Sequence, residues 1–556
     1  MKKLFIFTVL ACIASLVFAK GQGQGGTAGG ASNSPITISI FHETGDRPQP
    51  SPNNPIAKYL KEKLNVTFTW DILSGDINQK RGSMLATFES GPFPDVIELR
   101  GNEWIDEGVL IPLEDLIDKY GPRIKALYKD VWEKMKSPDG HVYYLINYSV
   151  IQGRDQSPDY NQAAFWVQKA VLKDAGYPKV VTVDQFFNMI EAYYRKNPTI
   201  NNQPTIPFTI LTHDWRAFEL WNPPNFLAGY PNEGNGIVNP RTYDYRTFFT
   251  MDISKRWFKK LNEMNAKGLI DRACFTDNFD QYTTKVASGR VLGQSVQGWQ
   301  FGAANNIVRD RVSNSRAMVP LPIVFADNIR PRYRNVPFPN LLRGMGITVK
   351  AARQKGRAER IIRFVNDFLA EDIQRTVNWG IEGQHWQRSP DGIPYRTPEQ
   401  RANWQNNSWQ VENRLTLLEA VFPKIEGSFS DGYPSDLSFY FPEREASLLP
   451  EDIELFKAYG VNGTNELMDK NPPPNAPWFP TWTIQPPPDD SDAKTALQLC
   501  ERTMKQKLPQ IIQAPPADFE RLWAAYVAEM NANGIARYEG YMQDKLNERL
   551  KAWGIR

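Results

Sequence analysis

Cysteine and histidine are both scarce in this chain of 556 residues. It contains three cysteines, Cys12, Cys274 and Cys500, and four histidines. Three cysteines are too few for a disulfide framework, and neither residue type recurs at the spacing of a zinc motif. The sequence therefore excludes a disulfide-stapled domain and predicts no metal site and no cofactor. One bridge between Cys274 and Cys500 remains open.

A long run of one charge is also missing. The 65 basic and 62 acidic side chains nearly balance, which leaves a net charge of +3. Nucleic-acid binding depends on clustered basic residues, so the composition excludes a nucleic-acid partner. Apolar residues make up 41% of the chain. At roughly 100 to 200 residues per domain, the chain is long enough for at least two hydrophobic cores.

The first residues have the pattern of an export signal. Two lysines precede an apolar run from Leu4 to Phe18, which is shorter than the roughly 20 residues of a membrane-spanning helix. Compact residues before the boundary predict cleavage after Ala19, so residues 1–19 form a signal peptide; lipidation of Cys12 is the alternative. Residues 20–35 are rich in Gly and Ser and form a flexible linker. Either route predicts an exported protein, periplasmic or anchored outside the cytoplasmic membrane.

The pattern of apolar residues from Ile36 onward alternates between strand and helix periods. Ile36, Ile38 and Ile40 alternate as in a strand, and Asn54 can cap a helix that begins at Pro55. Two further strands follow, the last ending near Glu98, so residues 36–98 predict a β-α-β-α-β unit with a parallel sheet. Ligands of such sheets bind at the carboxyl ends of the strands. His42, Glu43, Arg100 and Asn102 follow these ends and are candidate ligand-binding residues.

The middle of the chain repeats the mixed pattern, with strands near residues 207–211 and 290–296, and the chain closes with amphipathic helices over 518–530 and 534–552. The fold class is therefore α/β with two lobes. The predicted boundaries are 36–152 for the first part of lobe 1, 153–325 for the first part of lobe 2, 326–387 for a return to lobe 1, and 388–556 for the completion of lobe 2 with C-terminal helices.

Five segments together resemble the extracellular solute-binding proteins of family 1, particularly the large LipO-like proteins of ABC importers. In the first of them, "PDV" at residues 94–96 is followed by a phrase in which Gly108, Leu110, Pro112 and Leu113 match the pattern G-x-L-x-P-L. The five segments are residues 93–122, 165–193, 261–276, 378–386 and 519–546. Lys169 and Val171 depart from the usual pattern of the second segment.

The resemblance implies a two-lobed periplasmic-binding-protein fold whose lobes close on a solute, with interlobe crossings. It implies a monomeric receptor without catalytic residues that binds a saccharide and delivers it to the membrane subunits of an ABC transporter. The length of the chain favours an oligosaccharide. Many relatives carry an acidic loop similar to a calcium-binding loop after the helix that here ends near Lys196. Residues 197–204 contain no carboxylate, so we expect no calcium ion there.

Tryptophan supplies further candidates, because aromatic faces stack on sugar rings and the chain has 16 tryptophans. Most tryptophans fill cores, so position must select among them. The selected residues lie at a glycine-bracketed strand end, in a polar loop broken by prolines, in the phrase at 378–386, and beside Gly344. They are Trp299, Trp215, Trp221, Trp379, Glu382, His385, Trp386 and Arg343.

Two other functions remain open from the sequence. A secreted glycosidase would also be rich in aromatic and acidic residues, but the chain has no nucleophile elbow, metal-ligand spacing or phosphate-binding loop. A peptide receptor with the same fold is the second alternative, because no residue pattern excludes it. The sequence favours a saccharide receptor that is not an enzyme.

Overall fold

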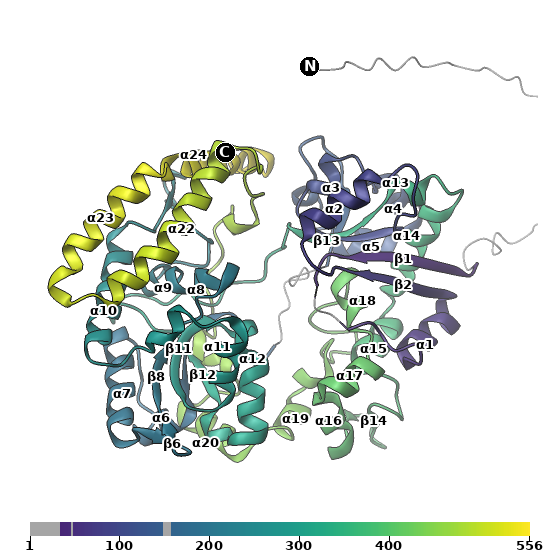
Figure 1. Ribbon diagram of the computed structural model, residues 1–556. Coiled ribbons are helices and arrows are strands. Elements are labelled where there is room, and N and C mark those ends of the chain that lie inside the picture. The colour runs from purple at the N-terminus through teal and green to yellow at the C-terminus, as the bar shows by residue number, and fades with distance from the viewer. Residues whose placement is uncertain (1–33, 46–47, 148–156) are drawn as a thin grey trace, which may run out of the picture.

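The computed structural model describes residues 34–45, 48–147 and 157–556. It consists of two lobes that lie side by side, each built on its own sheet (Figure 1). Two large hydrophobic clusters correspond to the two lobes. The predicted signal peptide and almost all of the predicted linker lie outside the described residues.

Lobe 1 is built on a five-stranded sheet with the order β2-β1-β3-β13-β4. β1 pairs in parallel with β2 and β3, whereas β13 is antiparallel to β3 and β4. The alternating isoleucines of β1 are buried, and Asn54 caps α1 by accepting the backbone N–H groups of Ile56 and Ala57. The strands are β1 (Ile36–His42), β2 (Val66–Ile72), β3 (Val96–Arg100), β4 (Tyr144–Ile146) and β13 (Arg343–Ile347). The predicted β-α-β-α-β unit is confirmed.

The helices of lobe 1 come from two stretches of the chain, residues 55–135 and 349–421. Residues 103–120 form two short helices rather than one, because Gly108 takes a φ of +68° and Pro112 follows it. The helices are α1 (Pro55–Leu64), α2 (Ile77–Ala86), α3 (Glu103–Asp106), α4 (Glu114–Tyr120), α5 (Pro122–Tyr128), η1 (Trp132–Met135), α13 (Val349–Ala352), α14 (Arg357–Phe368), α15 (Glu371–Trp379), α16 (Pro398–Gln405), α17 (Asn407–Asn413) and α18 (Thr416–Val421).

Lobe 2 is built on a four-stranded sheet with the order β12-β5-β11-β8. β11 is parallel to β8 and antiparallel to β5. Every residue of β5 and of β11 is buried, as expected for central strands covered on both faces. The strands are β5 (Ala163–Gln168), β8 (Ile206–Thr209), β11 (Val291–Gln297) and β12 (Met318–Leu321).

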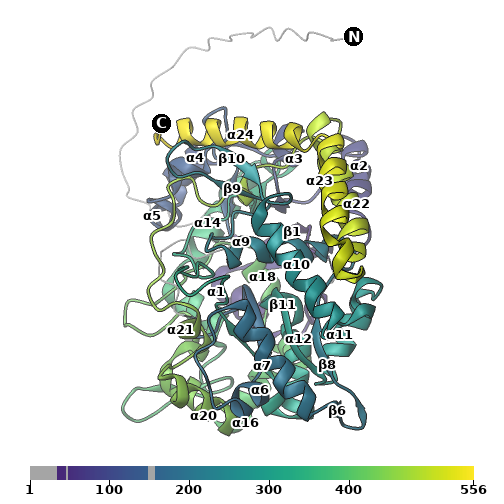
Figure 2. The same cartoon turned by 90° about the vertical axis from the view of Figure 1, so that its left-hand side faces the viewer.

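The helices of lobe 2 include a C-terminal group that packs against α10. In Figure 2, α22 and α23 run beside α10, and α24 lies across the top. The helices are α6 (Lys169–Asp174), α7 (Val183–Lys196), η2 (Asp214–Ala217), α8 (Phe218–Trp221), α9 (Pro223–Leu227), α10 (Asp252–Ala266), η3 (Arg272–Phe275), α11 (Phe279–Ala287), α12 (Gly298–Ile307), η4 (Val308–Val312), η5 (Asn314–Arg316), α20 (Pro450–Tyr459), α21 (Thr464–Met468), η7 (Thr481–Thr483), α22 (Asp492–Gln513), η8 (Pro516–Asp518), α23 (Phe519–Ala532) and α24 (Ile535–Ala552).

The predicted boundary at residue 388 is wrong. Residues 415–422 belong to the core of lobe 1, where Phe422 packs against Phe68 and Phe364 at ring-centroid distances of 6.1 and 5.2 Å. The chain packs against the core of lobe 2 again from Leu448 onward. The third crossing between the lobes therefore lies between residues 423 and 447, a stretch that contains η6 (Leu437–Phe439) and α19 (Phe441–Glu445).

Three small hairpins complete the fold: β6 (Thr199–Ile200) with β7 (Gln203–Pro204), β9 (Gly236–Val238) with β10 (Tyr245–Thr247), and β14 (Gln387–Arg388) with β15 (Pro394–Tyr395). The first of them forms the loop that lacks carboxylates. Cys274 and Cys500 are both buried and free, so the bridge left open by the sequence is not formed. Among the described helices, none is both long and apolar enough to cross a membrane.

Candidate ligand-binding site

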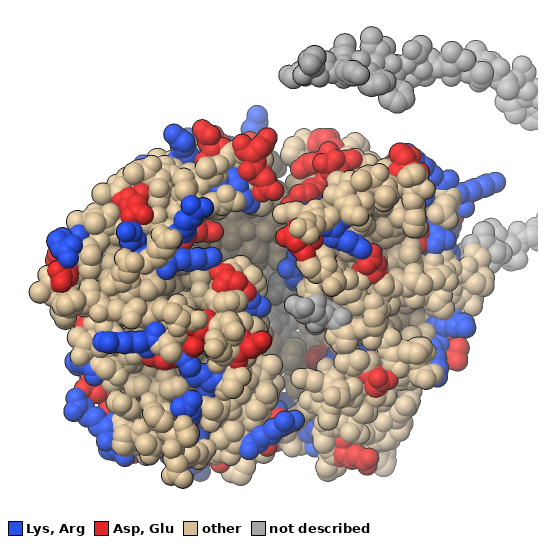
Figure 3. Space-filling view, in the orientation of Figure 1, with Lys and Arg blue, Asp and Glu red and all other residues tan. Residues whose placement is uncertain are grey.

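A groove separates the two lobes on the face shown in Figure 3. On the side of lobe 2, α8 and α12 lie nearest lobe 1, and on the side of lobe 1, β13, α2 and α3 lie nearest lobe 2 (Figure 1). These elements follow or border the strand ends at which an open α/β sheet binds ligands. The groove is therefore the candidate site.

Two exposed tryptophans of lobe 2 form a stacked pair. Trp215 is 57% exposed and Trp299 is 45% exposed, and their rings lie 6.0 Å apart with an interplanar angle of 12°. Phe218 stacks on Trp215 at 6.2 Å, and the guanidinium of Arg216 lies 4.6 Å from the centroid of the Trp215 ring. Indoles are normally at least partly buried in a protein core. We name the surface formed by Trp215, Trp299 and Phe218 the aromatic platform.

Sheet topology explains why residues so distant in sequence meet in the platform. β8 and β11 are adjacent and parallel, so their carboxyl ends lie at the same edge of the sheet. The loop after β8 carries Trp215, and Trp299 is the second residue of the helix that follows β11. This was the basis on which the sequence selected Trp299, and the structure places it beside Trp215.

The loop that carries Trp215 contains a backbone conformation that is unusual for a residue with a side chain. Asp214 has a φ of +50°, in the left-handed region that favours glycine. Its carboxylate pairs with Arg216 at 2.5 Å, and the Nδ1 of His213 lies 3.3 Å from it. Residues held in this region concentrate at functional sites, which supports a binding role for the loop.

Glu219 lies directly behind the platform. It is 2% exposed, and its Oε1 accepts the backbone N–H of Gln297 at 3.0 Å. Burial raises the pKa of this carboxyl to about 8, and the hydrogen bond from Gln297 opposes the rise. The group is therefore protonated at neutral pH.

Lobe 1 presents a polar edge rather than an aromatic one. Arg100 ends β3, and Arg343 begins β13 directly opposite it in the antiparallel register. Arg343 donates to Glu98 at 3.0 Å, and both arginines donate to the hydroxyl of Thr44, at 2.7 Å from Arg100 and 3.2 Å from Arg343. We name these four residues, Thr44, Glu98, Arg100 and Arg343, the polar edge. Thr44 and Glu98 were not selected from the sequence, although Thr44 follows a predicted strand end.

His42 and Glu43 lie beneath this edge. Glu43 accepts hydrogen bonds from the indole of Trp104 at 2.6 Å, from the guanidinium of Arg81 and from the backbone N–H of Arg100. Burial raises the pKa of Glu43 and Arg81 lowers it. His42 is fully buried beside Glu98. Both side chains support the strand ends and do not reach the groove surface, in contrast to their predicted contact with a ligand.

Asn102 has a partly exposed side chain next to the groove. It precedes α3, an element on the side of lobe 1 that faces lobe 2, and the neighbouring Gly101 has a φ of +111°. A Cβ at Gly101 would lie 3.4 Å from the side chain of Gln485 in lobe 2. Asn102 therefore stays a candidate at the junction of the lobes.

Four of the predicted ligand-binding side chains are buried elsewhere. Trp221 belongs to the core of lobe 2. Trp379 and Trp386 form an edge-to-face pair at 5.1 Å in a third, small core, with their indole N–H groups bonded to the carbonyls of Pro434 and Gly380. His385 is buried against Trp409. These side chains have no surface on which a solute could stack, so their predicted binding role is corrected to a structural one.

Glu382, from the same phrase, is exposed and pairs with Arg388 at a distance of 3.2 Å, across the turn that joins the two residues. The phrase at residues 378–386 therefore forms a compact turn outside the groove. Its two tryptophans, Trp379 and Trp386, are explained by the small core to which they belong.

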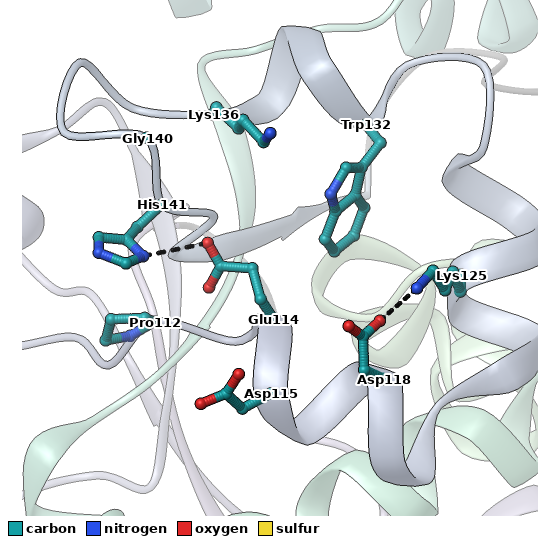
Figure 4. Close-up of a pocket in the computed structure, with 9 residues that line it drawn as sticks. All are labelled: Pro112, Glu114, Asp115, Asp118, Lys125, Trp132, Lys136, Gly140 and His141. Carbon is teal, nitrogen blue, oxygen red and sulfur yellow. Dashed lines mark hydrogen bonds and ion pairs between the residues drawn. The ribbon is translucent and has the colours of Figure 1, made fainter.

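A separate cavity of about 370 Å³ opens on lobe 1 between α4, α5, η1 and the loop before β4 (Figure 4). Trp132 and Glu114 point into it, but the charged groups around it largely satisfy one another. His141 pairs with Glu114 at 3.2 Å, and Lys125 pairs with Asp118. None of the strand ends that border the groove lines this cavity, so it is distinct from the candidate site.

No group of three or more His, Cys, Asp or Glu side chains in the described parts of the chain could hold a metal ion.

Residues 55–368, more than half of the chain, match the family of bacterial extracellular solute-binding proteins. The chain belongs to this family. The prediction from the five segments is thereby confirmed at the level of an extracellular solute-binding protein.

One relative of this chain is the fructooligosaccharide ABC transporter substrate-binding protein FusA of Streptococcus pneumoniae serotype 4. It is 29% identical over 252 residues, which cover 42% of this chain and 45% of FusA, so the match spans less than half the length of that protein. The structure of FusA with kestose superposes with a TM-score of 0.61 at 17% identity and covers 92% of this chain and 99% of FusA.

An HMO-binding solute-binding protein from Bifidobacterium longum infantis gives the same TM-score of 0.61 at 18% identity, with coverage of 92% of this chain and 99% of that protein. At this level of identity the likeness concerns the fold. The two-lobed α/β fold of a solute-binding protein is confirmed.

Proposed function

We propose that this protein is the extracytoplasmic substrate-binding component of an ABC importer and that it binds an oligosaccharide between its lobes without altering it. The observation that carries the proposal is the aromatic platform at the groove. Stacked, exposed indoles offer flat apolar faces to the C–H surfaces of sugar rings, and an edge of arginine, threonine and glutamate side chains opposite them offers donors and acceptors for hydroxyl groups.

Closure of the lobes would bring the two surfaces onto opposite sides of one solute. A solute that touches both lobes stabilises the closed form by its extra contacts with that form. The segments that cross between the lobes would supply the hinge, and membrane subunits of the importer would recognise the closed state. The protein acts as an exported monomer, either free after cleavage behind Ala19 or anchored through Cys12.

The relatives support the class of solute. FusA is described as binding fructooligosaccharides, and the Bifidobacterium protein as HMO binding. Both ligand descriptions concern saccharides. The aromatic platform gives an independent reason to expect the same class here.

The test is binding of a panel of oligosaccharides, including fructooligosaccharides, alginate fragments and human milk oligosaccharides, and of a panel of peptides, measured by the shift in Tm and by calorimetry. Trp215→Ala and Trp299→Ala should each weaken binding of the glycan about fivefold or more, as expected for loss of about 1 kcal/mol of aromatic contact. Tyr395→Ala, which removes an exposed ring on β15 of lobe 1, is the matched control and should bind normally.

The outcomes separate the candidate functions. A glycan recovered unchanged after saturable binding supports the receptor. Conversion of the glycan to a product would show an enzyme, and stabilisation by peptides alone would show a peptide receptor with the same fold. Equal affinity of the wild type and both tryptophan variants would remove the platform from the site.

A further inference from the structure

The two tryptophans of the aromatic platform are both connected to one buried carboxyl group, that of Glu219. Trp215 is stacked on Phe218, the first residue of α8, and Glu219 is the next residue in that helix. The Oε1 of Glu219 accepts the N–H of Gln297, the last residue of β11. Trp299 follows two residues later, in the first turn of α12.

We propose that Glu219 is a positioning residue that holds Trp215 and Trp299 together as one stacking surface. Its hydrogen bond joins α8, which lies behind Trp215, to the end of β11, which precedes Trp299. The proposal rests on the function proposed above for the platform. It does not require Glu219 to touch the solute.

The charged and polar groups around Glu219 determine whether its carboxyl is neutral or ionised in this role. On η2, Asp214 and Arg216 pair with each other. On α11, the hydroxyl of Tyr282 donates to Gln294 at 2.7 Å; burial raises the pKa of the tyrosine, and its position near Glu219 adds to the rise. The sequences of β11 and α9 contain no titratable residue. None of these groups supplies a positive charge that would favour the ionised form of Glu219.

The role of Glu219 therefore depends on a proton. A neutral carboxyl keeps its acceptor oxygen on Gln297 at little desolvation cost, whereas a carboxylate in the same place is a buried charge without a cationic partner. Ionisation above pH 8 would draw water between α8 and the end of β11 and separate the two indoles. Binding of the solute should weaken over the same range of pH.

The experiment compares the wild-type mature protein with Glu219→Gln, which keeps the acceptor oxygen and removes the proton equilibrium. The first readout needs no solute: acrylamide quenching and near-ultraviolet circular dichroism of the stacked indoles between pH 6.5 and 9.5, with Trp215→Phe/Trp299→Phe defining their contribution. In the wild type, the signal of the pair should be lost with a midpoint near pH 8. In Glu219→Gln it should remain constant.

Glu233→Gln is the matched control. Glu233 is another buried glutamate of lobe 2, but it accepts hydrogen bonds from Trp478 and Thr481, on the loop that precedes α22. Burial raises its pKa as well. This variant should retain the pH response of the wild-type platform, because of the two glutamates it is Glu219 whose side chain bonds to the end of β11.

The second readout is the affinity for the best glycan at pH 7 and at pH 9. Wild-type affinity should fall about fivefold or more, and Glu219→Gln should keep its pH 7 affinity. An indole signal that is flat in the wild type, or that changes equally in Glu219→Gln, would refute the positioning role. If no glycan binds but the signal still titrates only when Glu219 is present, the saccharide function fails and the positioning role stands.

Discussion

His385 provides a sharp test of the structural role of the phrase at residues 378–386. The ring is 2% exposed, and its Nδ1 accepts the backbone N–H of Ile381 at 3.0 Å. The proton of the neutral ring must therefore lie on Nε2. A second proton would have to occupy Nδ1 and face the N–H of Ile381, so protonation breaks this hydrogen bond.

Two effects lower the pKa of His385 to about 4: burial, which is the larger, and the positive charge of Arg396. In the unfolded chain the imidazole has its ordinary pKa of about 6.5. Between these values the unfolded state binds more protons than the folded state, so the free energy of unfolding falls as the pH falls. At about 1.4 kcal/mol per pH unit, the loss is about 3 kcal/mol across this window. The stabilisation is fully present above pH 6.5.

His385→Asn should remove this dependence, because an amide oxygen can accept the same N–H and does not titrate. The measurement is urea-induced unfolding of both proteins between pH 4 and 8, followed by the fluorescence of the adjacent tryptophans. The variant should be less stable than the wild type at pH 7.5, through lost ring packing against Trp409, and the gap should close as the pH falls toward 4.

Gln384→Asn, at an exposed neighbouring position, is the control and should run parallel to the wild type at every pH. If His385→Asn also runs parallel to the wild type, the buried neutral imidazole is not the origin of the acid sensitivity, and the assignment of this phrase to a packed core loses its support.

Three further predictions follow from particular contacts. Gly380→Ala should destabilise the protein by about 1 to 3 kcal/mol in thermal unfolding, because the residue has a φ of +88° and a Cβ would lie 2.4 Å from the Nδ1 of His385. Arg444→Met should cost about 1 to 3 kcal/mol in thermal unfolding through loss of its bidentate pair with Asp159 at 2.6 and 2.8 Å, and Asp159→Asn should also lower the Tm, because it leaves the buried guanidinium of Arg444 without its carboxylate partner. Dithiothreitol should leave the Tm unchanged, because Cys274 and Cys500 are free; a lower Tm would show a disulfide.

The carboxyl ends of the strands could be predicted from the sequence, because the alternation of apolar residues and the parallel arrangement of the strands indicate the same positions. Alternating isoleucines set the faces of β1, and a parallel arrangement then fixes where its carboxyl end lies. The same reasoning selected Arg100 and Trp299 from segments about 200 residues apart. Neither selection needed knowledge of side-chain packing.

Burial of tryptophan could not be predicted in the same way. Trp379 lies at the end of α15, and its cover comes from Phe429 and Leu437, which approach from the third crossing. No periodicity links these segments, so the small core and the crossing were missed together. The helix α22 was missed as well; Pro509 lies inside it and normally indicates a helix end.

The two faces of the groove differ in what a solute must displace when it binds. The platform of lobe 2 exposes apolar rings, so a sugar that lands there displaces only water. On lobe 1, the Nη2 of Arg343 already donates to Glu98 and Thr44, so a hydroxyl group that takes this donor must exchange with these partners. Solute should therefore bind lobe 2 first and reach the polar edge during closure.

This order predicts different kinetic effects for variants of the two lobes. Trp299→Ala should slow association and speed dissociation, because it removes contacts made in the first encounter and in the closed state. Arg343→Met should leave the association rate near that of the wild type and raise the dissociation rate, because its contacts form only on closure. Stopped-flow measurement of indole fluorescence resolves the two rates. A slower association with Arg343→Met and an unchanged one with Trp299→Ala would reverse the order and place the first encounter on lobe 1.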